Sequence, residues 1–108
     1  MKLFHNYYTY ILVCSDLSYY VGVTNDLDRR LLEHNNGDDK SSYTYNRRPV
    51  VIKYYEHFVD INQAILREKQ LKGWRRKKKE ALFEQDFEKL VELSKSKGKQ
   101  DGNMDNKG

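Results

Sequence analysis

The sequence has little with which to fix a fold covalently. Its 108 residues include one cysteine, Cys14, so no intramolecular disulfide can form, and the Cys and His spacing of a zinc site is missing. No stretch approaches the roughly 20 apolar residues that cross a bilayer. The opening residues lack the basic region and the small-residue cleavage site of a signal peptide. We therefore expect a cytoplasmic protein that has no membrane partner and depends on a hydrophobic core.

The length leaves room for one domain, since domains usually have about 100 to 150 residues, and this excludes a two-lobed enzyme. With 38% hydrophobic and 13% aromatic residues, the chain is expected to be globular. The last residues contain no aromatic side chain and one methionine, too little to offset the entropy of ordering them. We expect a domain over residues 1–93 and a disordered polar tail over residues 94–108.

Positive charge is concentrated in one segment. The chain has 20 Lys and Arg against 16 Asp and Glu, a net charge of +4. Residues 67–79 hold eight basic residues and one acidic residue, while the remainder has 12 basic and 15 acidic residues. Such a basic segment suits a polyanion, first of all a nucleic acid. The alternative is an ordinary solvated face of an exposed helix.

Three stretches rich in aromatic and β-branched residues predict strands, at residues 7–14, 19–24 and, after the proline, 50 to about 57. Asp and Ser in residues 15–18 favour a turn, so the first two stretches predict a β-hairpin. Residues 37–48 are rich in Gly, Asp, Asn and Ser and show little periodicity. We expect a loop there.

Four stretches predict helices. The first is capped by Asn25 or Asp26 and ends near Gly37, and its core-facing residues are expected to be Leu27, Leu31 and Leu32. The second begins with a capping box at Asp60 and ends near Gly73, and its apolar stripe consists of Ile61, Ala64, Ile65 and Leu71. Further helices are expected over residues 75–83 and from residue 86 onward. The fold class is therefore α/β, of the α+β type.

Glu68 falls at an unexpected position in the second helix. Steps of three and four along the stripe reach position 68, so the carboxylate falls on the apolar face. Burying an ionised carboxylate is costly unless a cation or a metal pairs with it. Glu68 is therefore a candidate metal ligand or acid/base group. The alternative is a structural ion pair with Arg30 or a nearby lysine.

Arg30 and His34 lie four residues apart and therefore project from one face of the first helix. The guanidinium suits phosphate oxygens, and the imidazole can accept or relay a proton near neutral pH. A solvated helix surface is the alternative. Tyr8 and Tyr10 share a face of the first strand, and Tyr20 lies in the second. Aromatic residues in strands usually pack, although a phenol at the edge of a core can also orient water.

Four motifs follow one another along the chain. They are Tyr8-Thr9-Tyr10, Tyr20-Val21-Gly22, residues 27–31 (LDRRL) with His34, and residues 67–72 (REKQLK). Their joint order is the signal, with Arg30 ten residues after Tyr20. Together with residues 43–50, these motifs resemble the GIY-YIG nuclease superfamily, and in particular its small stand-alone bacterial members. The resemblance extends over residues 7–83.

The resemblance implies a small three-stranded antiparallel sheet flanked by helices, and it implies a role for each motif residue. Tyr10 and Tyr20 would line the active site and position or deprotonate the attacking water. Arg30 would bind the scissile phosphate. Glu68 would hold one divalent metal ion, and His34 would assist the base.

The sequence departs from the pattern of that superfamily at three points, one of which is that the polar residue, often Asn, that some members carry after the third helix has no clear match in Glu84 or Gln85. Tyr8-Thr9 stands where larger members have Gly-Ile, and we expect this pair to fill space near the site. Val23 stands where some nucleases have a catalytic lysine, so the proton relay is expected to run through His34 or the tyrosines. Ionising a tyrosine of pKa about 10 costs about 4 kcal/mol at pH 7. We therefore expect Tyr10 to accept a proton while His34 draws its own proton away.

The function expected from these motifs is a metal-dependent endonuclease that hydrolyses phosphodiester bonds in DNA, structure-selective or weakly specific. The cofactor is expected to be one weakly bound Mg²⁺ or Mn²⁺, with no organic cofactor. The partner is DNA or RNA, and a second protein could lend specificity. The expected nucleic-acid contacts are Arg67, Lys69, Lys72, Arg75, Arg76, Lys77 and Lys78. The alternatives are an inactive nucleic-acid-binding module with the same fold and a protein-interaction domain that uses the tyrosines.

Overall fold

The computed structural model of the chain describes residues 5–99, and side chains as far as Ser94. Its contacts divide the chain into two compact units, with the boundary between Lys69 and Gln70. The first unit contains a sheet, one whole helix and the larger part of a second helix. The second unit contains the remaining helical residues. Within the described residues, no helix combines the length and apolar composition needed to span a bilayer.

The first unit is built on a three-stranded antiparallel sheet. Its strands are β1 (Tyr7–Val13), β2 (Tyr19–Thr24) and β3 (Val51–Phe58), in the order β2-β1-β3. The predicted hairpin and third strand are therefore confirmed, and β1 is the central strand. Together with helices α1 to α4, the sheet confirms the predicted α+β fold.

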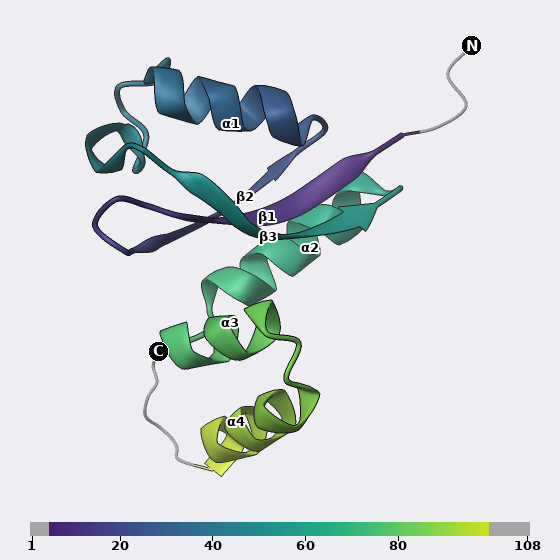
Figure 1. Cartoon of the computed structure of the whole chain (residues 1–108). Coiled ribbons are helices and arrows are strands. Elements are labelled where there is room, and N and C mark those ends of the chain that lie inside the picture. Colours follow the sequence, from purple (N-terminus) through teal and green to yellow (C-terminus); the bar gives the residue numbers. More distant parts are fainter. Residues whose placement is uncertain (1–4, 100–108) are drawn as a thin grey trace. The chain divides into compact units, whose positions relative to one another are not determined.

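Helix α1 (Leu27–Asn36) lies on one face of the sheet (Figure 1). The Asp26 carboxylate accepts a hydrogen bond from the backbone N–H of Arg29 at 3.0 Å, so Asp26 is the N-cap. Gly37 ends the helix in the left-handed conformation, with φ of 72°. Both ends of this helix are therefore specified locally, as predicted.

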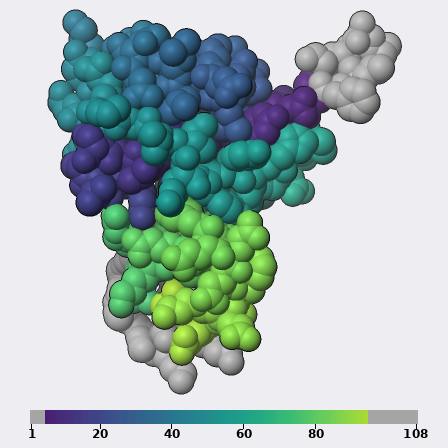
Figure 2. Space-filling view, viewed as in Figure 1, coloured from purple at the N-terminus to yellow at the C-terminus, as the bar shows by residue number. Residues whose placement is uncertain are grey.

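The core between α1 and the sheet contains Tyr10, Leu12, Cys14 and Val50, with Leu27 and Leu31 packed against them. Leu32 is 61% exposed, so the prediction that it faces the core is wrong. Its position is one residue beyond Leu31, and this 100° step turns the side chain away from the sheet. In the space-filling view, α1 (blue) and the residues after it (teal) adjoin each other (Figure 2).

Asn35 fastens the end of α1 to the start of β3. Its side-chain amide donates to the carbonyl of Val50 at 2.9 Å, and its side-chain oxygen accepts from the N–H of Val50 at 2.8 Å. The pair of bonds copies the pairing of a neighbouring strand and satisfies both backbone groups of a buried residue. His34, directly before Asn35, is held at a fixed place over the sheet as a result.

Helix α2 (Ile61–Lys72) follows β3, and its first residues lie on the other face of the sheet (Figure 1). The Asp60 carboxylate accepts from the N–H of Asn62 at 2.8 Å, which caps the helix. Ala64 is fully buried, and its carbonyl accepts a hydrogen bond from the Thr9 hydroxyl at 2.7 Å. Ile61 is exposed, so its predicted place in the apolar stripe is wrong. Ile61 is the first residue of α2, so no preceding turn of the helix covers its side chain.

We expected Thr9 to fill space near the site, but its side chain lies on the other face of the sheet, against α2. Successive side chains of a strand point to opposite faces, and Thr9 points toward α2 while its neighbour Tyr10 points toward α1. Tyr8 packs against Tyr55 and His57, with ring centroids 6.0 and 5.3 Å away. Tyr8 thus packs against side chains of β3, and Thr9 makes a hydrogen bond to α2.

The second unit contains the end of α2, helix α3 (Arg76–Phe83) and helix α4 (Phe87–Lys99). Leu71, Ala81 and Leu82 are its buried apolar residues within the described range. Helix α4 continues to Lys99, past the boundary that we expected after residue 93. Residues 100–108 of the expected tail lie outside the described residues, and the domain limits stay a prediction.

Candidate active site

The first unit contains a cavity of about 520 Å³. Side chains from five segments line it, namely β1, β2, α1, the loop after α1, and α2. The five residues to which the sequence analysis assigned chemistry are all among them: Tyr10, Tyr20, Arg30, His34 and Glu68. The fold therefore brings together residues that are up to 58 positions apart in the chain.

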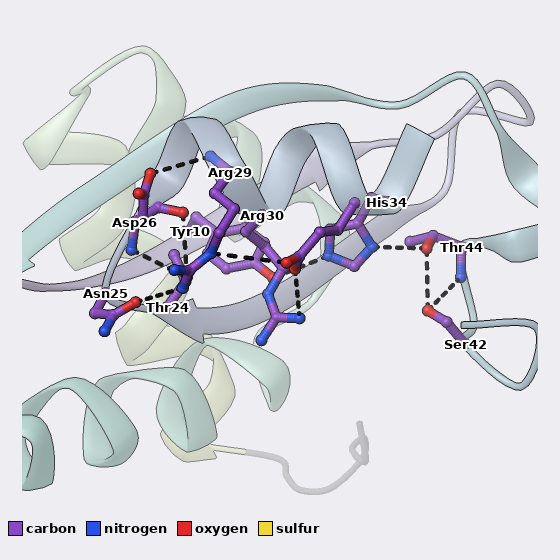
Figure 3. A network of polar contacts seen from close by, with 10 residues as sticks. Tyr10, Thr24, Asn25, Asp26, Arg29, Arg30, His34, Ser42 and Thr44 are labelled. Atoms are coloured by element: carbon purple, nitrogen blue, oxygen red, sulfur yellow. Dashed lines mark hydrogen bonds and ion pairs between the residues drawn. The ribbon is translucent and has the colours of Figure 1, made fainter. Parts of the chain in front are cut away.

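A chain of hydrogen bonds crosses the inner end of the cavity (Figure 3). The Tyr10 hydroxyl lies 3.0 Å from Nε2 of His34, and Nδ1 of the same ring lies 2.8 Å from the Thr44 hydroxyl. The Thr44 hydroxyl is in turn 3.0 Å from the hydroxyl of Ser42. Both nitrogens of His34 are thus engaged by hydroxyl groups, each of which can donate or accept.

Tyr10 is the most enclosed member of this chain, with 2% of its surface exposed. Burial is the largest cause that raises the pKa of its hydroxyl above the ordinary value, and the nearby Tyr20 adds to it. Arg30 acts in the opposite direction. Tyr10 is therefore a neutral phenol at pH 7, and its O–H is available to donate.

Gly22 makes room for the Tyr10 ring. The two residues are paired across β1 and β2. A Cβ atom on Gly22 would lie 2.5 Å from the Tyr10 hydroxyl oxygen and 2.7 Å from Cζ, closer than real contacts allow. The glycine of the second motif is thus explained by the position of the phenol that lies over it.

His34 is held as a neutral base. Burial is the first cause that lowers the pKa of its imidazole, and the positive charge of Arg30 is the second. Glu33 opposes both with a smaller effect. A neutral imidazole has one nitrogen that donates and one that accepts, so this ring can take up a proton from Tyr10.

Arg30 lies at the mouth of the cavity, and its side chain is 43% exposed. One terminal nitrogen makes an ion pair with Glu33 at 3.4 Å, which is long. Its Nε is buried and makes no hydrogen bond within the described part of the chain. A guanidinium has five N–H donors, so most of this fork is available to an anion in the cavity.

Glu68 lies in α2, one turn beyond the buried Ala64, and it is half-buried rather than enclosed in the core. Ile65 and Glu68 both line the cavity, so at this point the stripe of α2 faces the cavity. This placement explains how a carboxylate occurs on an apolar stripe. It also keeps Glu68 accessible to an ion from solvent.

The donor set fits a weakly held divalent cation. Carboxylate oxygens are the ligands that Mg²⁺ and Mn²⁺ prefer, and Mg²⁺ usually keeps several waters. Among residues 5–99, no three His, Cys, Asp or Glu side chains gather in the manner of a preformed metal site. Glu68 would therefore hold the ion with help from water and from substrate oxygens.

Tyr20 lies between the hydrogen-bonded chain and the loop. Its ring meets the edge of His34, with centroids 5.3 Å apart, and it stacks on Tyr43 at 6.1 Å. The guanidinium of Arg47 lies 3.8 Å above the Tyr43 ring. Tyr20 thus restricts the movement of His34 and joins the loop to the sheet.

Two of the residues predicted to contact nucleic acid, Arg67 and Lys78, are largely buried against other side chains of the protein. Arg67 grips Glu56 with two hydrogen bonds of 2.9 Å, and both side chains are only 23% exposed. Lys78 is 8% exposed, with its ammonium 4.3 Å above the Trp74 ring. The side chains of Arg67 and Lys78 are therefore less accessible to a polyanion than the exposed members of the set. The exposed members of the set are Lys69, Lys72, Arg75, Arg76 and Lys77.

Three further residues line the cavity that were not predicted from the sequence, Glu33, Ser42 and Thr44. Glu33 is three residues after Arg30 and four after Arg29, and the pairing rule for helices could have found it. Thr44 and Ser42 lie in the segment that we expected to be a loop, just before a short 3₁₀ helix, η1 (Tyr45–Arg47). The tertiary fold brings them to His34, and no local pattern marks them.

Comparisons with known proteins identify the family of the chain. The model of the GIY-YIG catalytic domain matches residues 6–81. A UPF0213 protein of Bacillus pumilus is 46% identical over 81 residues, which cover 75% of this chain and 82% of that protein. A UPF0213 protein of Halobacterium salinarum is 43% identical over 77 residues, covering 71% of this chain and 99% of that protein.

A solved structure has the same fold. The solution NMR structure of a protein from E. faecalis aligns with a TM-score of 0.52 and 37% identity, over 80% of this chain and 88% of that chain. The names of these relatives state no activity, whereas the matched family is described as a catalytic domain and suggests a nuclease. This chain, with its motif residues gathered in one cavity, belongs to the GIY-YIG family.

Proposed function

We propose that this protein is a metal-dependent endonuclease that hydrolyses phosphodiester bonds in DNA. The observation that carries the proposal is the hydrogen bond between the buried Tyr10 hydroxyl and the neutral His34, at the edge of a cavity that also presents Arg30 and Glu68. Hydrolysis needs an activated water, neutralised phosphoryl charge and a stabilised leaving oxygen. The cavity offers a side chain for each need.

Tyr10 and His34 activate the water together. The Tyr10 oxygen accepts a proton from the water while the phenol passes its own proton to Nε2 of His34, 3.0 Å away. The hydroxyl is therefore never a free phenolate, a state that its raised pKa makes costly. The net result is a protonated His34 and an attacking hydroxide. The proton returns to solvent afterwards.

Arg30 receives the scissile phosphate. Its guanidinium lies at the cavity mouth with a buried Nε that has no hydrogen bond within residues 5–99. A phosphate oxygen that accepts from this N–H satisfies the donor and places negative charge beside a fixed positive charge. Because the ion pair with Glu33 is 3.4 Å long, phosphate can compete with it. Charge added during attack strengthens this contact.

Glu68 would hold the divalent ion on the α2 side of the cavity. When bound, such an ion supplies positive charge that stabilises the phosphoryl and leaving oxygens. A single carboxylate gives low affinity without substrate. We therefore expect half-maximal activity at millimolar rather than micromolar Mg²⁺.

Nucleic-acid affinity is proposed to come from the exposed cations Lys69, Lys72, Arg75, Arg76 and Lys77. Such contacts to phosphate are independent of base sequence. The five cations give affinity without a sequence code, so we propose an enzyme that selects a nucleic-acid structure or cleaves with low specificity.

The experiment is a cleavage assay on labelled duplex, flapped, branched and single-stranded DNA, with matching RNA, in Mg²⁺ and in EDTA. Wild-type protein should cleave at least one of these in Mg²⁺ and none in EDTA. Arg30→Ala should not cleave. Arg29→Ala is the matched control, since Arg29 is its neighbour on α1 but does not line the cavity, and it should cleave normally.

Binding without cleavage by the wild-type protein in every condition would contradict the proposal. It would favour the alternative of an inactive nucleic-acid-binding module. Equal cleavage by wild-type protein and Arg30→Ala would point to a contaminating nuclease.

A further inference from the structure

Thr44 lies on the opposite side of the His34 ring from Tyr10. Its hydroxyl is 2.8 Å from Nδ1, and the Tyr10 hydroxyl is 3.0 Å from Nε2. A neutral imidazole carries one proton, on one of these two nitrogens. Thr44 is 1% exposed, so solvent does not compete for its contact. The two hydroxyls therefore decide between the tautomers of His34.

The Tyr10 side favours an accepting Nε2. A phenol is intrinsically a stronger acid than an aliphatic hydroxyl, and although burial raises the pKa of Tyr10, it remains the better donor of the two neighbours of the ring. Donation from Tyr10 requires that Nε2 carries no proton. The ring proton is then on Nδ1 and points at the Thr44 oxygen.

The Thr44 side can accept that proton, because its own hydroxyl hydrogen has another partner. Ser42 Oγ lies 3.0 Å from the Thr44 hydroxyl, and it also accepts from the Thr44 backbone N–H at 3.3 Å (Figure 3). When the Thr44 hydroxyl donates to Ser42, its lone pairs face Nδ1. The hydrogen bonds then run in one direction, from Tyr10 through His34 and Thr44 to Ser42.

We propose that Thr44 is a positioning residue that keeps the proton of neutral His34 on Nδ1 and so keeps Nε2 open to the phenol proton of Tyr10. In the other tautomer Nε2 already holds a proton, and the transfer from Tyr10 has no acceptor. The consequence for catalysis rests on the function proposed above. The tautomer itself does not.

The remaining groups around His34 act on its charge and leave the tautomer to the hydroxyls. Arg30 and Glu33 face it from α1, with opposite effects on its pKa. Tyr20 faces it from β2 through ring contact. Above the pKa of His34, the neutral ring is the species whose tautomer can be measured.

The test is a long-range ¹H–¹⁵N correlation spectrum of ¹⁵N-histidine-labelled full-length protein at pH 8. The pattern of His34 in wild-type protein should be that of the Nδ1–H tautomer, and Thr44→Ser should keep it. Thr44→Val removes the acceptor at nearly constant volume and should shift the population toward Nε2–H. An Nε2–H pattern in wild-type protein would overturn the proposal, and so would an unchanged pattern in Thr44→Val.

Single-turnover cleavage gives a second reading. Thr44→Val should lower the rate about 10- to 100-fold, as losses of supporting hydrogen bonds commonly do, with little change in DNA affinity. Thr44→Ser should restore most of the rate. Asn46→Ala is the control and should keep the wild-type rate, because Asn46 is an exposed residue of the 3₁₀ helix directly after Thr44.

The NMR spectrum and the cleavage rate together distinguish a failure of the proposed function from a failure of the role proposed for Thr44. If no substrate is cleaved but the Nδ1–H tautomer depends on Thr44, the proposed function fails and the assignment of Thr44 stands. If wild-type protein cleaves DNA and His34 is the Nε2–H tautomer, the function stands and Thr44 loses its role. If Thr44→Val does not fold, the wild-type tautomer and Thr44→Ala still decide.

Discussion

The two sides of the cavity differ in how far they are enclosed. On the closed side, Tyr10, His34 and Thr44 engage one another at 2.8 to 3.0 Å, and two of the three are almost fully buried. On the open side, Arg30 and Glu68 are half-exposed, and Arg30 keeps a buried donor without a partner in the described structure. The difference indicates a division of labour. On the closed side the groups for proton transfer are in place before substrate binds. On the open side the substrate supplies a partner for the Arg30 donor.

The largest effect is expected from breaking the closed side. Tyr10→Phe and His34→Ala should each lower the cleavage rate about 10²- to 10⁴-fold, because either change removes the proton acceptor. Since the two residues act as a unit, the double variant should be no worse than the poorer single variant. Rates from single-turnover assays, compared in a double-mutant cycle, measure this. Additive losses would mean that the residues act independently.

The next largest effect is expected on the open side. Glu68→Gln removes the charge of the proposed metal ligand and should cost about 10²- to 10³-fold in rate, with a higher Mg²⁺ concentration for half-maximal activity. A Mg²⁺ titration of the cleavage rate is the measurement. Thermal unfolding, which reports on folding alone, serves as the control. A variant with the wild-type Mg²⁺ dependence would remove Glu68 from the metal site.

A change at Gly22 tests the closed side of the cavity alone, because a side chain there would displace the Tyr10 ring. Gly22→Ala places a methyl group 2.5 Å from the Tyr10 hydroxyl and should push that ring away from His34. Misplacement by about 1 Å costs roughly 10²-fold in rate, and overpacking costs about 1 to 3 kcal/mol in stability. Kinetics and denaturant unfolding measure the two effects. Unchanged kinetics would show that the Tyr10 position tolerates movement.

The sequence predicted the frame better than the chemistry within it. The hairpin, the third strand and the Asp26 and Gly37 ends of α1 follow from local turn, cap and alternation rules, and the structure has them. The i, i+4 spacing and the family motifs also indicated Arg30 and His34. These are signals within a few residues of the chain.

The misses have tertiary causes. Thr44 becomes significant because a loop with no periodicity returns to the ring of His34. Glu68 was predicted as a site residue, but helical periodicity alone does not reveal that the apolar stripe faces a cavity at that turn. Arg67 and Lys78 are part of a basic segment by composition, yet Glu56 and Trp74 hold them in the folded protein. Charge counts do not distinguish a solvated cation from a packed one.

The smallest effect is expected from two neighbouring lysines of the second unit. Lys77 is exposed and Lys78 is buried. Lys77→Ala should weaken DNA binding modestly and lower the slope of log affinity against log salt by about one. Lys78→Ala should leave that slope unchanged and lower the melting temperature. Binding titrations across a salt series compare the two, and equal slopes would contradict the assignment.

The pH dependence of cleavage tests the central claim, that neutral His34 receives the proton of Tyr10. Because burial and Arg30 lower the pKa of His34 below its ordinary 6.5, the accepting form is already dominant at pH 7. Single-turnover rates should rise with pH through an apparent pKa below 6.5 and level off by neutrality, and His34→Ala should lack this rise. A rate that falls as pH rises through this range, or the same profile in both proteins, would contradict the account.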